Sequence, residues 1–195
     1  MISVNEEKKR ILSDTQRWLE RAVIGLNLCP FAKSVYTKHL IRYAISDALS
    51  ETELLTDLQN ELLFLNSVSA TNTETTLLIA PLCLHHFWEF NKFIPKTSRL
   101  LTKLGLDGVL QIATMHPHYQ FADTEVNDIT NYTNRSPYPI LHILRESSID
   151  RALQAIPNAE SIFEVNINTM RRIGKDGWHD LGVQATILTQ QHAIE

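Results

Sequence analysis

The stretch Thr75–Ala80, with the sequence TTLLIA, is short, nearly all apolar and followed by Pro81. Its length favours a strand over a helix, and its apolar character favours a strand that is buried on both faces. The stretch therefore predicts a central strand of an α/β sheet.

Patterns on either side of this strand alternate between strand and helix. Leu40–Ile45 and Gly108–Thr114 have the residue content of strands, and we expect a fourth strand at Ile140–Leu144. Helical periodicity predicts helices over residues 5–26, 50–65, 84–104, 148–155 and 159–173. Alternation of this kind is typical of strands joined by right-handed crossovers. We expect an α/β fold with a mixed, largely parallel sheet of about four strands, an N-terminal amphipathic helix and a C-terminal helical pair.

Three details of the helices can be predicted from single residues. Ser50 with Glu53 three positions later is a capping-box signature for a helix start. Pro95 is expected to kink or split the helix over residues 84–104. A glycine-flanked tail around Trp178 is expected to follow the last helix.

Composition limits the class of protein. The 195 residues fit one domain on a scale of roughly 100–200 residues each, so residues 1–195 are expected to form a single domain. The formal net charge of −4 argues against nucleic acid as a partner, because a basic face is expected there. The two cysteines do not form a disulfide framework. A polar N-terminus without a long apolar window favours a cytoplasmic protein without membrane contact.

The segment Met115–Pro139 is the most informative part of the chain for function. It is rich in Asp, Asn, Thr and Pro and is predicted to be a long loop after the third strand. Loops longer than about 12–15 residues are uncommon in compact domains and are usually functional or disordered. Ligands of open α/β sheets bind beyond the carboxyl ends of strands. We therefore expect the functional site in and beside this loop.

Residues of this region carry groups suited to a small anionic ligand. Imidazoles exchange protons near neutral pH, and guanidinium groups bind carboxylates or phosphates with paired hydrogen bonds. The predicted catalytic residues are His116 and His142, and the predicted substrate-binding residues are Asn131, Asn134, Arg135, Ser136 and Arg145. The alternative is structural, because Asn, Ser and Thr also satisfy the backbone of a long loop.

Cys29 is a further catalytic candidate. In the sequence NLCPFA, Pro30 suits the first position of a short helix, which would place Cys29 at its N-cap and lower the pKa of the thiol. If Cys29 instead ends the preceding helix, it is a small buried apolar residue.

A metal site is a weaker alternative. His116, His118 and His142 together resemble the ligand set of a hydrolytic zinc site. Pro117 separates the first two histidines and no acidic partner is evident, so no metal ligands are assigned.

Three motifs resemble an uncharacterised bacterial family known as a domain of unknown function. The motifs are GLNLCPFA at residues 25–32, GVLQIATMHP at 108–117 and TNRSPYPILHILRE at 133–146. In this resemblance His116, Arg135 and His142 match the family pattern, whereas His118 stands at a variable position. The resemblance covers most of the chain and implies one coherent domain, but it implies no chemistry and leaves any cofactor unknown.

Two classes of function follow from these residues. The first is an enzyme of transferase or hydrolase type, in which Arg135 and Arg145 hold a small anionic metabolite and His116 or His142 moves a proton. Neither GxGxxG nor GxxxxGK is present in this chain of 6 glycines. The second is a non-catalytic binding or scaffold protein that docks a partner through Tyr132, Tyr138 and Arg135. A histidine-ligated metal hydrolase is a further alternative.

Overall fold

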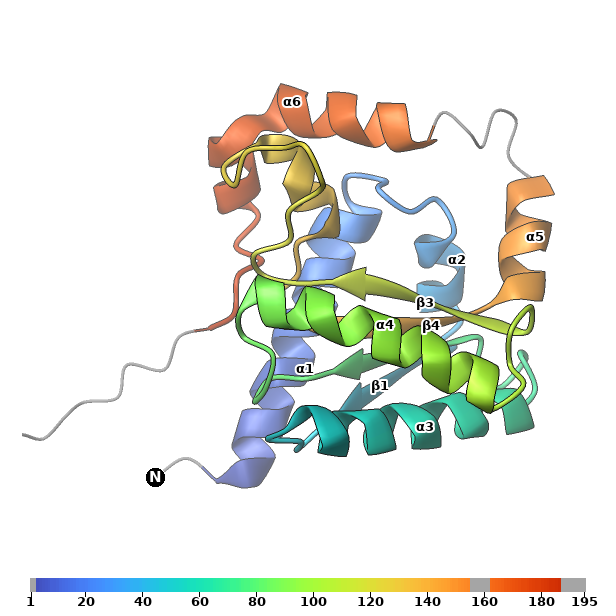
Figure 1. The fold of residues 1–195 in the computed structure, drawn as a ribbon. Helices are drawn as coiled ribbons and strands as arrows, with labels where there is room; N and C mark the ends of the chain where they lie inside the picture. Colours follow the sequence, from blue (N-terminus) through green and yellow to red (C-terminus); the bar gives the residue numbers. More distant parts are fainter. Residues whose placement is uncertain (1–2, 155–161, 187–195) are drawn as a thin grey trace, which may run out of the picture.

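The computed structural model describes residues 3–154 and 162–186. The elements follow in the order α1 (Val4–Trp18), η1 (Leu19–Ile24), α2 (Ala32–Thr37), β1 (Ile41–Ile45), α3 (Glu51–Ser67), β2 (Thr75–Ile79), α4 (Phe87–Lys103), β3 (Leu110–Met115), η2 (Ile129–Asn134), β4 (Ile140–Arg145), α5 (Glu146–Gln154) and α6 (Ile162–Asp180). Figure 1 shows these helices packed around one sheet.

The sheet has four strands in the order β1-β2-β4-β3. Strand β1 pairs in parallel with β2, whereas β4 lies between β2 and β3 and is antiparallel to both. Strands β1, β2 and β3 therefore share one direction and β4 runs against them. The prediction of a mixed α/β sheet of four strands is confirmed. The chain reverses after β3 through residues 116–139, and this return explains why most of the hydrogen-bonded pairing is antiparallel.

Each face of the sheet packs into its own core. Leu78, Leu141 and Ile143 pack with α3 and α4, and we call this side the α3–α4 face. Leu77, Ile79 and Ile140 pack with residues of α1, η1 and α6, and we call this side the α1–α6 face. In Figure 1, α3 and α4 lie in front of the strands, with α1 and α2 on the far side. Because successive strand residues point to opposite faces, neighbours in the sequence enter different cores.

The N-terminal helix widens into a π-helix. Residues 5–26 are predicted as one helix, and the structure has α1 followed directly by the π-helical η1. Gly25 ends this segment with a φ of −63°, which any residue can adopt. A Cβ at Gly25 would lie 2.3 Å from the carbonyl oxygen of Arg21. Glycine is therefore required here for space, and the left-handed residue of the turn is Asn27, with a φ of 55°.

The two helices of the α3–α4 face agree with the helices predicted over residues 50–65 and 84–104, except in the effect of Pro95. Helix α3 begins after Ser50, whose hydroxyl accepts a hydrogen bond from the Glu53 N–H, and the Glu53 carboxylate accepts from the Leu49 N–H. Helix α4 continues through Pro95, so the prediction that Pro95 splits the helix is wrong. Pro95 and Asn91, four residues earlier, are both exposed. The Asn91 carbonyl, which lacks its helical donor, is therefore open to water.

The C-terminal helical pair is present as α5 and α6. The predicted limits at residues 155 and 159–161 lie outside the described residues. Helix α6 is interrupted by a kink at Gly174, whose φ of 63° and ψ of −173° are not helical, and a second helical segment continues to Asp180. Trp178 is thus a buried helical residue and not part of a tail, because its ring packs in the core of the α1–α6 face. None of the helices in the described part of the chain combines the length and apolar character that a bilayer crossing needs.

Candidate functional site

The two histidines predicted as catalytic lie on opposite faces of the sheet. His116 directly follows β3, and its ring packs on Phe87 and Phe90 of α4, on the α3–α4 face. His142 lies in β4 between Leu141 and Ile143, which both point to the α3–α4 face. Strand alternation therefore places His142 on the α1–α6 face. A single site cannot contain both rings, so the three-histidine set with His118 is not assembled either. Among the described residues, no three His, Cys, Asp or Glu side chains form a group that could hold a metal ion.

His116 has the environment of a structural residue. Its side chain is fully buried, its Nε2 lies 3.0 Å from the Leu84 carbonyl oxygen, and its Nδ1 accepts from the His118 N–H at 3.0 Å. A carbonyl only accepts, so Nε2 carries the proton and both ring nitrogens have partners. Burial lowers the pKa of His116 to about 4, which keeps the ring neutral. Leu84, which supplies the carbonyl, has a left-handed φ of 57°.

The predicted polar residues of the loop bind its own backbone. The Asn131 side chain is buried, accepts from the Phe121 N–H and the Thr124 hydroxyl, and donates to the Glu125 carbonyl. Asn134 donates weakly, at 3.4 Å, to the Thr114 carbonyl, and Ser136 donates to the Tyr138 carbonyl at 2.6 Å. These contacts match the alternative in which the polar side chains have a structural role, because they satisfy the backbone groups of a long loop.

Both predicted anion-binding arginines also donate to main-chain carbonyls. Arg135 donates to Tyr119 and Val126 and stacks 3.9 Å from the centroid of the Tyr132 ring. Arg145 lies on the α3–α4 face and donates to the carbonyls of Leu65, Val68 and Thr73, at and beyond the end of α3. The two guanidinium groups thus serve different parts of the fold and do not converge on one ligand.

The aromatic residues expected to anchor a partner have internal contacts. The Tyr132 ring meets Trp178 edge-on, with 5.4 Å between the centroids. The Tyr138 hydroxyl donates to the Asp14 carboxylate.

Cys29 is not at a helix N-cap. Helix α2 is preceded by Phe31, and the Cys29 N–H bonds back to the Val23 carbonyl of η1. Burial raises the pKa of the Cys29 thiol, although the N–H groups of Phe31 and Ala32 oppose this shift. The thiol therefore has the character of a partly buried apolar group.

His142 is the predicted residue whose ring keeps a free acceptor. Its Nε2 lies 2.7 Å from Oγ1 of Thr75, and the same oxygen lies 2.6 Å from the Ile143 carbonyl oxygen. Thr75 has one hydroxyl proton, and the carbonyl can only accept it. The Thr75 oxygen must therefore accept from Nε2–H, which leaves Nδ1 with a lone pair. Within the described residues this Nδ1 has no protein hydrogen-bond donor.

The surroundings of His142 are apolar and incompletely covered. His142 pairs with Leu77 on one side and Ala113 on the other. Leu77 is buried, whereas His142, Ala113 and Leu144 are each partly exposed. Burial lowers the pKa of His142 to about 4. The imidazole is thus neutral at physiological pH and presents an acceptor above a largely apolar floor.

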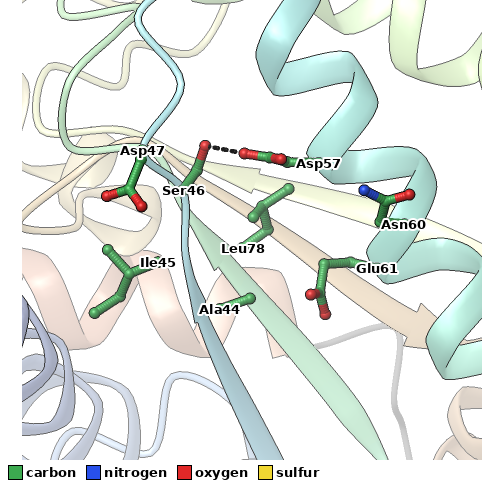
Figure 2. Close-up of a pocket in the computed structure, with 8 residues that line it drawn as sticks. All are labelled: Ala44, Ile45, Ser46, Asp47, Asp57, Asn60, Glu61 and Leu78. Atoms are coloured by element: carbon green, nitrogen blue, oxygen red, sulfur yellow. Dashed lines mark hydrogen bonds between the residues drawn. The ribbon is translucent and has the colours of Figure 1, made fainter.

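A separate pocket of about 230 Å³ lies between β1 and α3. Figure 2 shows Ser46 and Asp57 joined across one end of it, at 2.5 Å. Its other polar groups are already paired in part, since Glu61 binds Arg42 and Asp47 binds Lys8. None of the residues predicted for the functional site lines this pocket.

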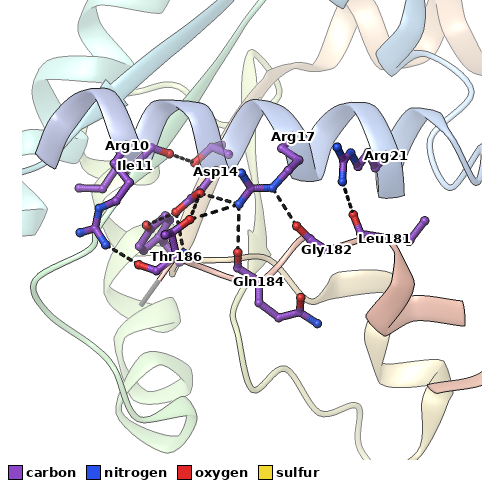
Figure 3. A network of polar contacts seen from close by, with 11 residues as sticks. Arg10, Ile11, Asp14, Arg17, Arg21, Leu181, Gly182, Gln184 and Thr186 are labelled. Carbon is purple, nitrogen blue, oxygen red and sulfur yellow. Dashed lines mark hydrogen bonds and ion pairs between the residues drawn. The ribbon is translucent and has the colours of Figure 1, made fainter. Parts of the chain in front are cut away.

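Sequence reasoning did not single out Asp14, a buried carboxylate that accepts four hydrogen bonds. Asp14 accepts from the Tyr138 hydroxyl, from the N–H and hydroxyl of Thr186, and from Arg17. Figure 3 shows how Arg10, Arg17 and Arg21 on the same helix reach the C-terminal segment, where they donate to main-chain carbonyls. Residues 10, 14, 17 and 21 are three or four positions apart, which places them on one side of a helix. This spacing is the sequence pattern that could have identified the cluster.

The fold and the site define a class of α/β protein: a four-stranded mixed sheet, covered by helices on both faces, with the neutral histidine His142 on the α1–α6 face. The chain belongs to the family described as Protein of unknown function (DUF1415), whose model matches residues 10–180. That match includes all four strands and His142. No curated protein and no solved structure matches the chain.

Proposed function

We propose that the protein is an enzyme that binds a small molecule on the α1–α6 face and uses Nδ1 of His142 as its proton acceptor. The observation that carries the proposal is the Thr75 contact, because it fixes the tautomer and leaves one nitrogen free. A neutral imidazole that a second residue holds in one orientation can accept a proton as a general base. The partial exposure of Ala113, His142 and Leu144 gives a small molecule a surface to contact.

The other predicted residues have supporting roles in this proposal. His116, Asn131 and Arg135 hold the loop through residues 116–139, and Arg145 holds the end of α3. Their bonds to main-chain groups give each of these side chains a structural role without a ligand, although the buried Nε of Arg145 has no hydrogen-bond partner among the described residues.

A comparison of three proteins tests the proposal: wild type, His142→Gln and His118→Gln. A glutamine at 142 keeps an N–H donor for Thr75 and lacks an acceptor in the position of Nδ1. The same change at the exposed His118 is the matched control. Each protein is incubated with a small-molecule cell extract, and the compounds are followed by mass spectrometry.

We expect wild type and His118→Gln to consume at least one compound that His142→Gln leaves unchanged. The melting temperatures of the three free proteins should agree within about 2 °C, a shift that corresponds to less than about 1 kcal/mol. Ligand-dependent thermal shifts without consumption would favour the non-catalytic binding alternative. Equal consumption by all three proteins would contradict the role of His142, and no consumption or thermal shift would contradict the site.

A further inference from the structure

The hydrogen bonds of His142 and Thr75 also restrict which chemical group of a ligand can bind to the His142 ring. The Nε2–H group of His142 donates a hydrogen bond to the Thr75 hydroxyl oxygen, and the Thr75 hydroxyl donates to the Ile143 carbonyl. The polar group that remains is the Nδ1 lone pair, which accepts and cannot donate while the ring is neutral. A ligand group opposite Nδ1 must therefore supply a proton.

The described residues beside this nitrogen offer no compensation for a negative charge. On the same face, the strand neighbours of His142 are Thr75, Leu77, Ala113, Ile140 and Leu144, and none of them is charged. The two arginines expected to hold an anion are engaged elsewhere, Arg135 with loop carbonyls and Arg145 on the opposite face. On α5, Arg151 is paired with Glu74 at 3.7 Å. Gln111, also on this face of β3, is an uncharged amide.

We infer that the group bound at His142 is a hydroxyl or an uncharged amine on an apolar body, and not a carboxylate or phosphate. An anionic oxygen there would meet the Nδ1 lone pair, so two acceptors would oppose each other. It would also be partly desolvated over an apolar floor, which is costly for an unpaired charge. A hydroxyl or amine instead donates to Nδ1 while its apolar body contacts Ala113 and Leu144. This inference rests on the proposed function and replaces the anionic ligand expected from the sequence with a proton-donating one.

Three matched probes, used at neutral pH, test the inference: benzyl alcohol, aniline and benzoate. They share one ring and differ in the polar group. Each is titrated into protein labelled with ¹⁵N in histidine, and the Nδ1 resonance of His142 is followed. We expect saturable shifts with the alcohol, the amine or both, and binding at least about tenfold weaker for benzoate, a difference of about 1.4 kcal/mol.

Variants separate the possible outcomes. In uniformly ¹⁵N-labelled protein, the shifts that the alcohol or amine causes in backbone resonances around residue 142 should disappear in His142→Gln and persist in His118→Gln. Binding of benzoate with equal or higher affinity, or conversion of the ring to imidazolium on binding, would overturn the inference while leaving a ligand site at His142. Absence of any saturable shift would overturn both the inference and the proposed function.

Discussion

The Tyr138 hydroxyl donates a 2.8 Å hydrogen bond to the carboxylate of Asp14, a residue 124 positions earlier in the chain. The same carboxylate accepts from the N–H and hydroxyl of Thr186. One buried side chain on α1 therefore fixes both the segment that enters β4 and the C-terminal segment that follows α6 (Figure 3).

Substitution Asp14→Asn should destabilise the protein by about 2–4 kcal/mol, because a neutral amide replaces a buried carboxylate that accepts several hydrogen bonds. Urea unfolding measures the change. Tyr138→Phe, which removes one donor, should cost only about 1 kcal/mol. Equal losses for the two variants would contradict the central place of the carboxylate.

The difference between wild type and Asp14→Asn should also depend on pH. Burial alone would raise the pKa of Asp14, but hydrogen bonds from Thr186, Tyr138 and Arg17 outweigh burial and hold it below its usual value. A carboxyl whose folded pKa is lowered stabilises the protein above its unfolded pKa of about 3.9. The advantage of wild type should therefore be constant near neutral pH and should shrink as the pH falls below about 4.

Stability of the wild type should fall as the pH is lowered from about 6.5 toward 4, because His116 is buried in the neutral state. Its folded pKa is about 4, whereas an unfolded histidine has a pKa of about 6.5. Within this window the unfolded chain binds the extra proton, at a cost to stability of up to about 1.4 kcal/mol per pH unit.

Unfolding free energies of wild type and His116→Gln, measured by urea unfolding across this pH window, test the effect. The variant should be less stable at neutral pH and should show a shallower slope with pH. Some slope should remain in the variant, because burial also lowers the pKa of His142. His118→Gln should keep the wild-type slope, and an unchanged slope in His116→Gln would show that the ring is not buried neutral.

Arg145→Met should loosen the end of α3, because the guanidinium donates to three carbonyls there, at 2.8, 2.8 and 3.0 Å. We expect a loss of about 1–3 kcal/mol and faster hydrogen exchange in the last turn of α3. Arg151→Met is the matched control, since its ion pair with Glu74 is long and exposed and should contribute less than about 0.5 kcal/mol. Unchanged exchange in α3 would indicate that Arg145 has another role.

The positions of the strands and most helices could be predicted because their signals are local. The TTLLIA run identifies β2, and Ser50 identifies the start of α3. Pro95 was misjudged because the cost of a helical proline depends on whether the carbonyl four residues earlier reaches water. Trp178 was misjudged because a second helical segment follows the kink at Gly174.

The sequence by itself determined the elements, the α/β class and the chemical groups available, since periodicity and capping act over a few neighbouring residues. Tertiary structure alone decided which of those groups meet. Insertion of β4 between β2 and β3 places His142 on one face, while the exit from β3 places His116 on the other. The physical reason is that a strand residue's face depends on pairing with distant strands, and a buried polar atom takes its partner from whatever segment the fold brings within hydrogen-bond distance.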